Sequence, residues 1–197
     1  MTDPRPYHHG DLRRTLLHAA AEVIAADGPA ALSLRALARR AGVSHAAPAH
    51  HFGDRTGLLT ALAAEGYGLL ADALAAIRPE PPDRLRDLGA GYVTFALTHP
   101  AHFDVMFRPH LLHPDDPELA RQRERAWAEL LGGITGEEEA AEAPRPVALA
   151  AWSLAHGYAT LCLDGSTPTP DDPAAAFREL ATVTALGSHR PRGGAPG

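Results

Sequence analysis

The side chains of this chain that are best suited to chemistry are its arginines and histidines. All 18 of its basic residues are arginines, and it carries 12 histidines but a single cysteine, Cys162. Arginine offers a flat fork of N–H donors that fits phosphate and carboxylate groups. Histidine binds metal ions when neutral and becomes a cation just below neutral pH. These residue types favour anion recognition or metal binding over thiol chemistry.

Catalysis by a nucleophile has little support in the sequence. Cys162 lies in the apolar stretch Thr160–Asp164 without an adjacent base, so a buried and unreactive thiol is expected. The glycine pairs at 132–133 and 193–194 lack the strand and helix that accompany a phosphate-binding loop. One cysteine also excludes a disulfide framework within the chain and suits a reducing compartment. We therefore expect no enzyme activity and no cofactor.

Metal binding is the alternative that the histidines leave open. His99 and His102 form one H-x-x-H pair, and His110 and His113 form another. Carboxylates such as those at positions 115 and 116 could complete such a site. On this interpretation the chain is a metal-responsive regulator or a small metal-binding protein. The prolines at positions 100, 109 and 114 turn the backbone without directing the four rings to one point, so surface histidines without a metal are the favoured interpretation.

The segments that must position these side chains have the apolar period of helices throughout. Apolar residues recur at three- and four-residue steps, while residues that favour strands are sparse and never alternate over a useful length. The sequence therefore predicts an all-α fold, with helices at 11–26, 34–41, 44–52, 55–77, 83–98, 100–107, 117–131, 146–163 and 173–186. Residues 132–144, rich in Glu and Ala, are expected to form a mobile loop.

Composition divides the chain into two domains and a tail. Residues 1–53 are expected to form a three-helix domain and residues 54–187 a larger helical domain, followed by a disordered, Pro- and Gly-rich tail at 188–197. The formal net charge is −6, but residues 1–60 hold seven arginines against five acidic residues. No apolar run approaches the roughly 20 residues that span a membrane. We expect a soluble, cytoplasmic protein without a membrane partner.

The segment Ser33–Phe52 has the layout of a helix-turn-helix. Two short helices flank Gly42, a residue type that reverses the chain at low cost because it accepts a positive φ. Ser33 and Ser44 are expected to cap the two helices. Pro48 lacks the N–H that would bond back to Ser44, which predicts a later start or a widened first turn. In such a motif the second helix presents its first turn to the DNA major groove, and nearby arginines neutralise phosphates.

The first 60 residues resemble the DNA-binding domain of the tetracycline-repressor (TetR) family of transcriptional regulators. The resemblance is carried by Leu16–Ala20, Gly28, Ser33–Ala38, Ala41–Ser44, His51-Phe52, Arg55 and Leu58-Leu59. It implies groove and phosphate contacts from Arg35, Ser44, His45, Ala46, Ala47, Ala49, His51 and Arg55, and His50 is a further donor on chemical grounds. Ala49 replaces the aromatic residue usual in the family, and Arg55 replaces the usual lysine while keeping its charge. For His51 and Phe52 the alternative is packing beneath the second helix.

The second half resembles a C-terminal domain type of the same family, marked by a tryptophan followed shortly by His-Gly. Here these residues are Trp152, His156 and Gly157. The two resemblances imply a helical homodimer that a small-molecule effector in the C-terminal domain releases from DNA. We interpret the chain as a repressor that binds double-stranded operator DNA in this way. The basic N-terminal residues would meet the duplex, while the acidic remainder is screened at physiological salt.

Large apolar side chains with polar neighbours indicate where an effector would bind. In a half dominated by Ala and Leu, aromatic residues form either the core or a pocket lining. The candidate pocket residues are Tyr92, Phe95, His99, Phe103, Met106, Phe107, Trp127, Trp152 and His156. The last two helices are rich in small residues, which favours a two-fold four-helix interface between subunits. The alternative is that these helices only cover the monomer's own core.

Overall fold

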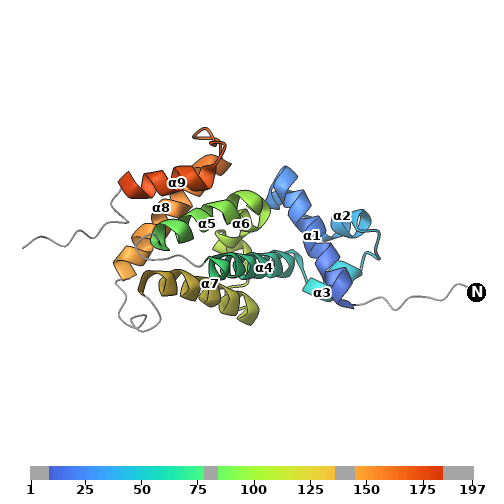
Figure 1. Cartoon of the computed structure of the whole chain (residues 1–197). Helices are drawn as coiled ribbons and strands as arrows, with labels where there is room; N and C mark the ends of the chain where they lie inside the picture. The colour runs from blue at the N-terminus through green and yellow to red at the C-terminus, as the bar shows by residue number, and fades with distance from the viewer. Residues whose placement is uncertain (1–8, 78–83, 136–144, 184–197) are drawn as a thin grey trace, which may run out of the picture. The chain divides into compact units, whose positions relative to one another are not determined.

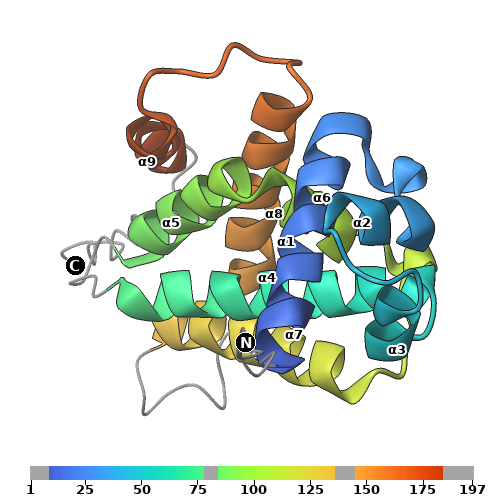
Figure 2. The same ribbon diagram turned by 90° about the vertical axis from the view of Figure 1, so that its right-hand side faces the viewer.

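The computed structural model describes residues 9–77, 84–135 and 145–183, and every regular element in these ranges is a helix (Figures 1 and 2). The expected all-α fold is therefore confirmed. In chain order the elements are α1 (His9–Asp27), η1 (Pro29–Ala31), α2 (Leu34–Arg40), α3 (Ala47–Phe52), α4 (Arg55–Ala76), α5 (Arg84–Thr98), α6 (Pro100–Met106), η2 (Pro109–Leu111), α7 (Pro117–Thr135), α8 (Arg145–Leu163) and α9 (Pro173–Val183).

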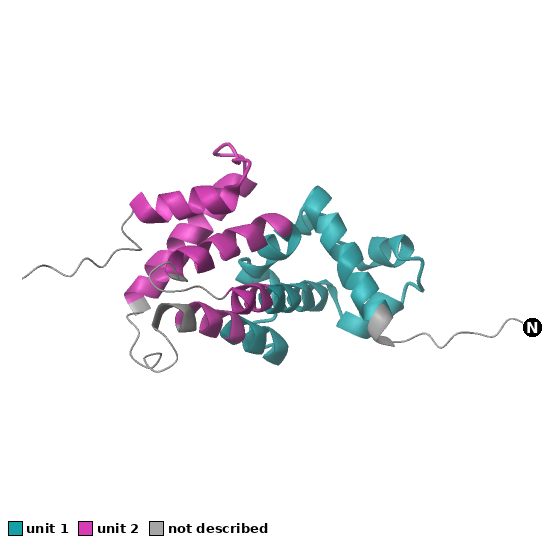
Figure 3. Cartoon of the chain, in the orientation of Figure 1, with its two compact units in different colours: residues 1–69, 99–124 teal, residues 70–98, 125–197 magenta. Residues whose placement is uncertain are grey.

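The chain forms two compact units (Figure 3). The first contains Met1–Leu69 and His99–Glu124, so it takes in α1 to α3, most of α4, α6 and the start of α7. Helix α2 packs against α1 and α3, and α1 also packs against α6. The core of this unit is built from leucines with no more than 1% of their surface exposed: Leu16, Leu37, Leu58, Leu59 and Leu62.

The second unit contains Leu70–Thr98 and Arg125–Gly197. Helix α5 lies at its centre, packed against α8 and α9. At Gly89 of α5 the ring of Phe177 from α9 comes so close that a Cβ atom built on the glycine would lie 2.3 Å from Cε1 of the ring. An ion pair between Arg178 and Asp87, 2.7 Å apart, joins the same two helices. Glycine thus sets the spacing of α5 and α9.

The helix boundaries correct the sequence interpretation at three points. The N-cap of α3 is Ala46 rather than Ser44, and the helix begins at Ala47. This agrees with the later start expected from Pro48, which occupies the first turn. Ser33 precedes α2 as expected, but its side chain makes no capping hydrogen bond. Helix α7 continues through the glycine pair at 132–133 to residue 135, where a loop was expected. The remainder of that loop, 136–144, and the tail at 188–197 lie outside the described residues.

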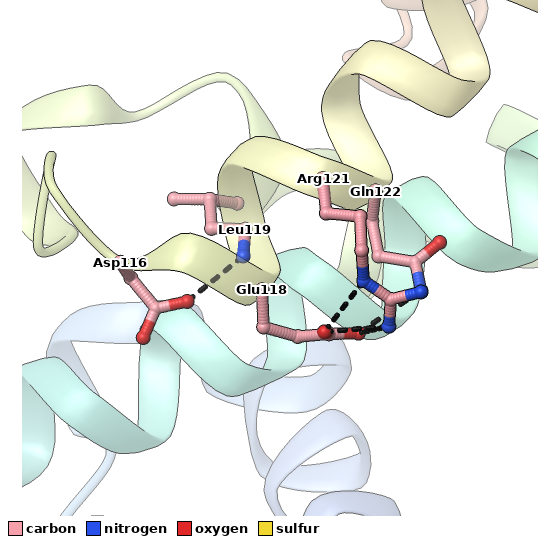
Figure 4. A network of polar contacts seen from close by, with 5 residues as sticks. All are labelled: Asp116, Glu118, Leu119, Arg121 and Gln122. Atoms are coloured by element: carbon pink, nitrogen blue, oxygen red, sulfur yellow. Dashed lines mark hydrogen bonds and ion pairs between the residues drawn. The ribbon is translucent and has the colours of Figure 1, made fainter.

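The start of α7 is fixed by a local polar network (Figure 4). One carboxylate oxygen of Asp116 accepts the backbone N–H of Leu119 at 2.8 Å, which satisfies a donor of the first turn. Glu118 accepts hydrogen bonds from Arg121 and Gln122, and these bonds hold the pKa of Glu118 below its usual value. Among the buried polar side-chain atoms of the described residues, one has no hydrogen-bond partner: Oε1 of Gln122.

Of the helices that the structure describes, two are apolar and long enough to cross a membrane by length and composition, which corrects the expectation that no such run exists. They are α4 and the stretch Pro146–Leu163 of α8. Over half of the α4 stretch is buried inside the protein, as in the core helix of a globular fold. Only 28% of the α8 stretch is buried, so its apolar residues are in good part exposed.

Candidate nucleic-acid interface

The turn between α2 and α3 is closed by backbone hydrogen bonds around one glycine. Gly42 has a φ of +66°, in the left-handed region that glycine adopts without strain. The N–H of Val43 donates to the carbonyl of Ala38 at 3.0 Å, and the N–H of Gly42 donates to that of Arg39 at 3.3 Å. This pair of bonds is a Schellman motif, which ends a helix and redirects the chain. The turn expected from the sequence is therefore present, for the physical reason expected.

The recognition segment, defined here as His45–Phe52, has an exposed and a buried side. His45, Ala46, Ala49 and His50 are exposed, whereas Pro48 is buried. Ala47, His51 and Phe52 are half-buried, and the ring of His51 lies 5.7 Å from that of His50 and 6.1 Å from that of Phe52. The segment thus presents two imidazoles and two methyl groups outward.

The arginines around this segment fall into two groups. Arg35 and Arg39 are exposed on α2. Arg40 donates to a carboxylate oxygen of Glu22 at 3.0 Å, an exposed pair that contributes little to stability. The guanidinium of Arg13 lies over the ring of Phe52, 5.4 Å from its centroid. The segment is therefore flanked by cations, two of which are held by contacts within the protein.

Arg55, expected from the resemblance to contact phosphate, makes two internal hydrogen bonds. Its Nε donates to the carbonyl of Leu32 at 3.1 Å and its Nη2 to the carbonyl of Pro29 at 2.6 Å. The same first turn of α4 is capped by Asp54, which accepts the N–H of Gly57 at 2.8 Å. That bond is the main reason why the pKa of Asp54 is lowered. Sequence spacing gave no signal for the Arg55 contacts, because the partners are backbone atoms more than 20 residues away.

The nine candidate effector residues divide between the two units. His99, Phe103, Met106 and Phe107 belong to the first unit, where the rings of Phe103 and Phe107 are 5.1 Å apart. Tyr92, Phe95, Trp127, Trp152 and His156 belong to the second. Tyr92, Phe95, Phe103 and Met106 are buried, and the other five are half-buried.

Three of the five residues in the second unit form a hydrogen-bonded chain. Nε1 of Trp152 donates to the hydroxyl of Tyr92 at 3.2 Å, and this hydroxyl lies 2.9 Å from Nδ1 of His156. The Trp127 ring meets that of Trp152 edge-on, with centroids 6.0 Å apart. Burial lowers the pKa of His156. The sequence identified each of these residues separately as a candidate for the effector pocket. It could not show that Tyr92 bonds to two side chains of α8 that lie 60 and 64 positions away.

The structure gives no support to the metal alternative. In the part of the chain that it describes, no group of three or more His, Cys, Asp or Glu side chains is placed to hold a metal ion. His102 instead faces Glu65 across 3.1 Å. His113 lies 3.7 Å from Asp54, and its backbone N–H donates to the buried hydroxyl of Thr60. The two H-x-x-H pairs thus have different neighbours.

Comparison with known proteins assigns this arrangement to a family. Residues 16–62 match the model for bacterial regulatory proteins of the tetR family, and residues 85–184 match the tetracyclin repressor-like C-terminal domain. The chain belongs to the TetR family. It is a transcriptional regulator with a helix-turn-helix domain, and members of this family bind DNA and usually dimerise. No curated protein matches the sequence significantly.

Solved structures agree with this TetR assignment. A Rhodococcus sp. RHA1 protein of unknown function is 34% identical, with a TM-score of 0.75, over 92% of this chain and 97% of that one. A regulatory protein of the tetR family, also from Rhodococcus RHA1, is 26% identical with a TM-score of 0.70, over 90% of this chain and 98% of that one. The similarity therefore extends over nearly the whole length of both chains.

Proposed function

We propose that this TetR-family regulator is a repressor that binds operator DNA as a homodimer and is released by a small-molecule effector. The observation that carries the proposal is the outward face of the recognition segment. His45, Ala46, Ala49 and His50 are exposed there, beside the exposed Arg35. Imidazoles can bond to base edges and methyl groups can contact thymine, while Arg35 neutralises phosphate. We also assign Ser44, Ala47 and His51 to this interface.

The proposed dimer contact lies on α8 and α9. Large apolar side chains of α8 are exposed: Val147, Leu149, Leu161 and Leu163. Exposed apolar residues grouped on one helix favour burial against another protein surface. A two-fold contact of these helices would supply the second recognition segment that a palindromic operator needs.

The proposed effector contacts lie in the C-terminal half, in a domain of the Trp-His-Gly type. The Tyr92–Trp152–His156 chain supports this proposal, because it combines aromatic surface with hydrogen-bonding groups. Phe95, His99, Phe103, Met106, Phe107 and Trp127 are assigned to the same role. Changes in this region would alter effector response and leave operator affinity without effector unchanged.

Selection of random duplexes on the purified protein tests the proposal. We expect the retained sequences to contain inverted half-sites about 10 base pairs apart, centre to centre, or a multiple of this. Arg35→Ala should weaken binding to all duplexes and lower the slope of log K against log salt by about 1, whereas His45→Ala should change base preference. Retention of no duplex above background would refute DNA binding.

The matched control is Arg125→Ala. Arg125 lies on α7 and pairs with Asp72 at an exposed site, so its removal should leave both affinity and salt slope unchanged. Transcription in vitro from a promoter that carries the selected site decides the sign of regulation, with repression expected. Activation would refute the repressor assignment.

A further inference from the structure

The guanidinium of Arg55 holds two backbone carbonyls that flank η1. These belong to Pro29, at the start of η1, and Leu32, which follows it. Both residues are buried. Leu32 precedes the N-cap of α2, so its carbonyl lies outside the hydrogen-bond ladder of that helix. Arg55 supplies a donor for this part-buried carbonyl.

The contact needs the shape of an arginine. Nε and Nη2 are two donors on one edge of a planar group, and they reach carbonyls three residues apart with lengths of 3.1 and 2.6 Å. A lysine ammonium at this position keeps the charge but is a single point with no such edge. Arg55→Lys therefore separates the role of charge from the role of geometry.

The start of α4 also meets the end of α3 at this place. A Cβ atom built on Gly57 would lie 2.0 Å from the carbonyl oxygen of Phe52, so the two backbones are in close contact. The first turn of α4 thus contacts the last residue of α3 through Gly57 and the approach to α2 through Arg55. The end of α3 and the segment that leads into α2 are therefore both in contact with the first turn of α4.

We propose that Arg55 is a positioning residue, which sets the orientation of α2 and α3 on the start of α4, and does not neutralise a phosphate. Without the two bonds, the Pro29–Leu32 segment loses its link to α4, and the recognition segment is no longer held in one orientation. DNA affinity then falls because binding must restore that orientation. This last step rests on the proposed function, whereas the link between Arg55 and the Pro29–Leu32 segment does not.

The test compares Arg55→Lys and Arg55→Met with the exposed Arg35→Lys and Arg35→Met. In the free protein, hydrogen exchange is followed at the amides of Leu32 and Leu37, which donate to Pro29 and Ser33 respectively. We expect faster exchange in both Arg55 variants and wild-type exchange in both Arg35 variants. Exchange at wild-type rates in Arg55→Lys would overturn the proposal, whether or not the protein binds DNA.

The second arm measures binding to a duplex selected by the wild-type protein, across a range of salt concentrations and well below the unfolding temperature. We expect Arg55→Lys and Arg55→Met to lose affinity alike, by about tenfold, with the wild-type salt slope. Arg35→Lys should keep its affinity, and Arg35→Met should lower the slope by about 1. If Arg55 contacts a phosphate, Arg55→Lys should bind normally and Arg55→Met should have a lower slope of log K against log salt. If Arg55 acts on stability alone, both variants should bind with normal affinity. Either result would overturn the proposal.

Discussion

The hydroxyl of Tyr92 on α5 joins two side chains of α8: it accepts the indole N–H of Trp152 at 3.2 Å and lies 2.9 Å from Nδ1 of His156. An indole nitrogen can only donate. The tyrosine hydroxyl therefore accepts from Trp152, and it forms a second hydrogen bond with Nδ1 of His156. Burial lowers the pKa of His156, which favours its neutral imidazole.

Removal of the Tyr92 hydroxyl should destabilise the protein. Tyr92→Phe deletes the acceptor for Trp152 and the hydrogen-bond partner of His156 Nδ1 at a buried position, which costs about 1–3 kcal/mol. Denaturant unfolding measures the change. Tyr158→Phe is the matched control, because the Tyr158 hydroxyl contacts the thiol of Cys162, a weak hydrogen-bonding group. Equal losses in the two variants would show that the Tyr92 chain adds nothing specific.

His156 should make stability fall in mild acid. Its folded-state pKa is below the ordinary histidine value of about 6.5, so the unfolded chain binds the proton more readily and stability rises with pH. The contribution is fully present above pH 6.5 and is lost as the pH falls through the lower folded pKa. We expect the free energy of unfolding to decrease less from pH 7.5 to pH 5 in His156→Gln than in the wild type. Parallel curves for the two proteins would contradict this.

Gly89→Ala should disrupt the packing of α5 on α9. Its methyl group would lie 2.3 Å from a ring carbon of Phe177, which is 2% exposed and has little room to move. Overpacking of this kind costs about 1–3 kcal/mol. Phe177→Leu removes the obstructing ring atoms, so a double-mutant cycle should show that Gly89→Ala costs less in that background. Strict additivity of the two losses would argue against the contact.

Charges on the exposed face of α8 should separate the proposed dimer. Leu149 and Leu161 are 52% and 47% exposed, and their replacement by Arg would place like charges at a two-fold contact. Light scattering at micromolar concentration should give a dimer mass for the wild type and a monomer mass for Leu149→Arg/Leu161→Arg. Ala128→Arg, at an exposed position of α7, should remain dimeric. A monomeric wild type would refute the proposed dimer.

The fold and the turn of the helix-turn-helix could be predicted because their signals are local. Apolar periodicity identified the helices, and Gly42 has the positive φ that its place in the turn requires. The later start of α3 followed from the missing N–H of Pro48. The cap at Ser44 was wrong because the tight turn is closed by backbone bonds, with the carbonyl of Ser44 accepting the N–H of Ala47.

Tertiary contacts account for what the sequence could not show. Arg55 binds two backbone carbonyls. Every residue has a backbone carbonyl, so no pattern of residue types in the sequence marks these two. Tyr92 is far from Trp152 and His156 along the chain, and only packing brings the three side chains into one set of hydrogen bonds. The extension of α7 through two glycines also opposes local helix propensity. The DNA and effector contacts of individual residues remain predictions.

The hydrogen bonds from Arg55 to the carbonyls of Pro29 and Leu32 limit where this protein can be joined to a relative in a hybrid. A hybrid joined after Gly53 would take its first three helices from one parent and the arginine from another. A parent with lysine at this position would leave the two carbonyls without their fork-shaped donor. A junction placed inside α4, beyond its first turns, would transfer the arginine and its acceptors together. Hybrids made there should retain the operator specificity of the parent that supplies the residues before the junction.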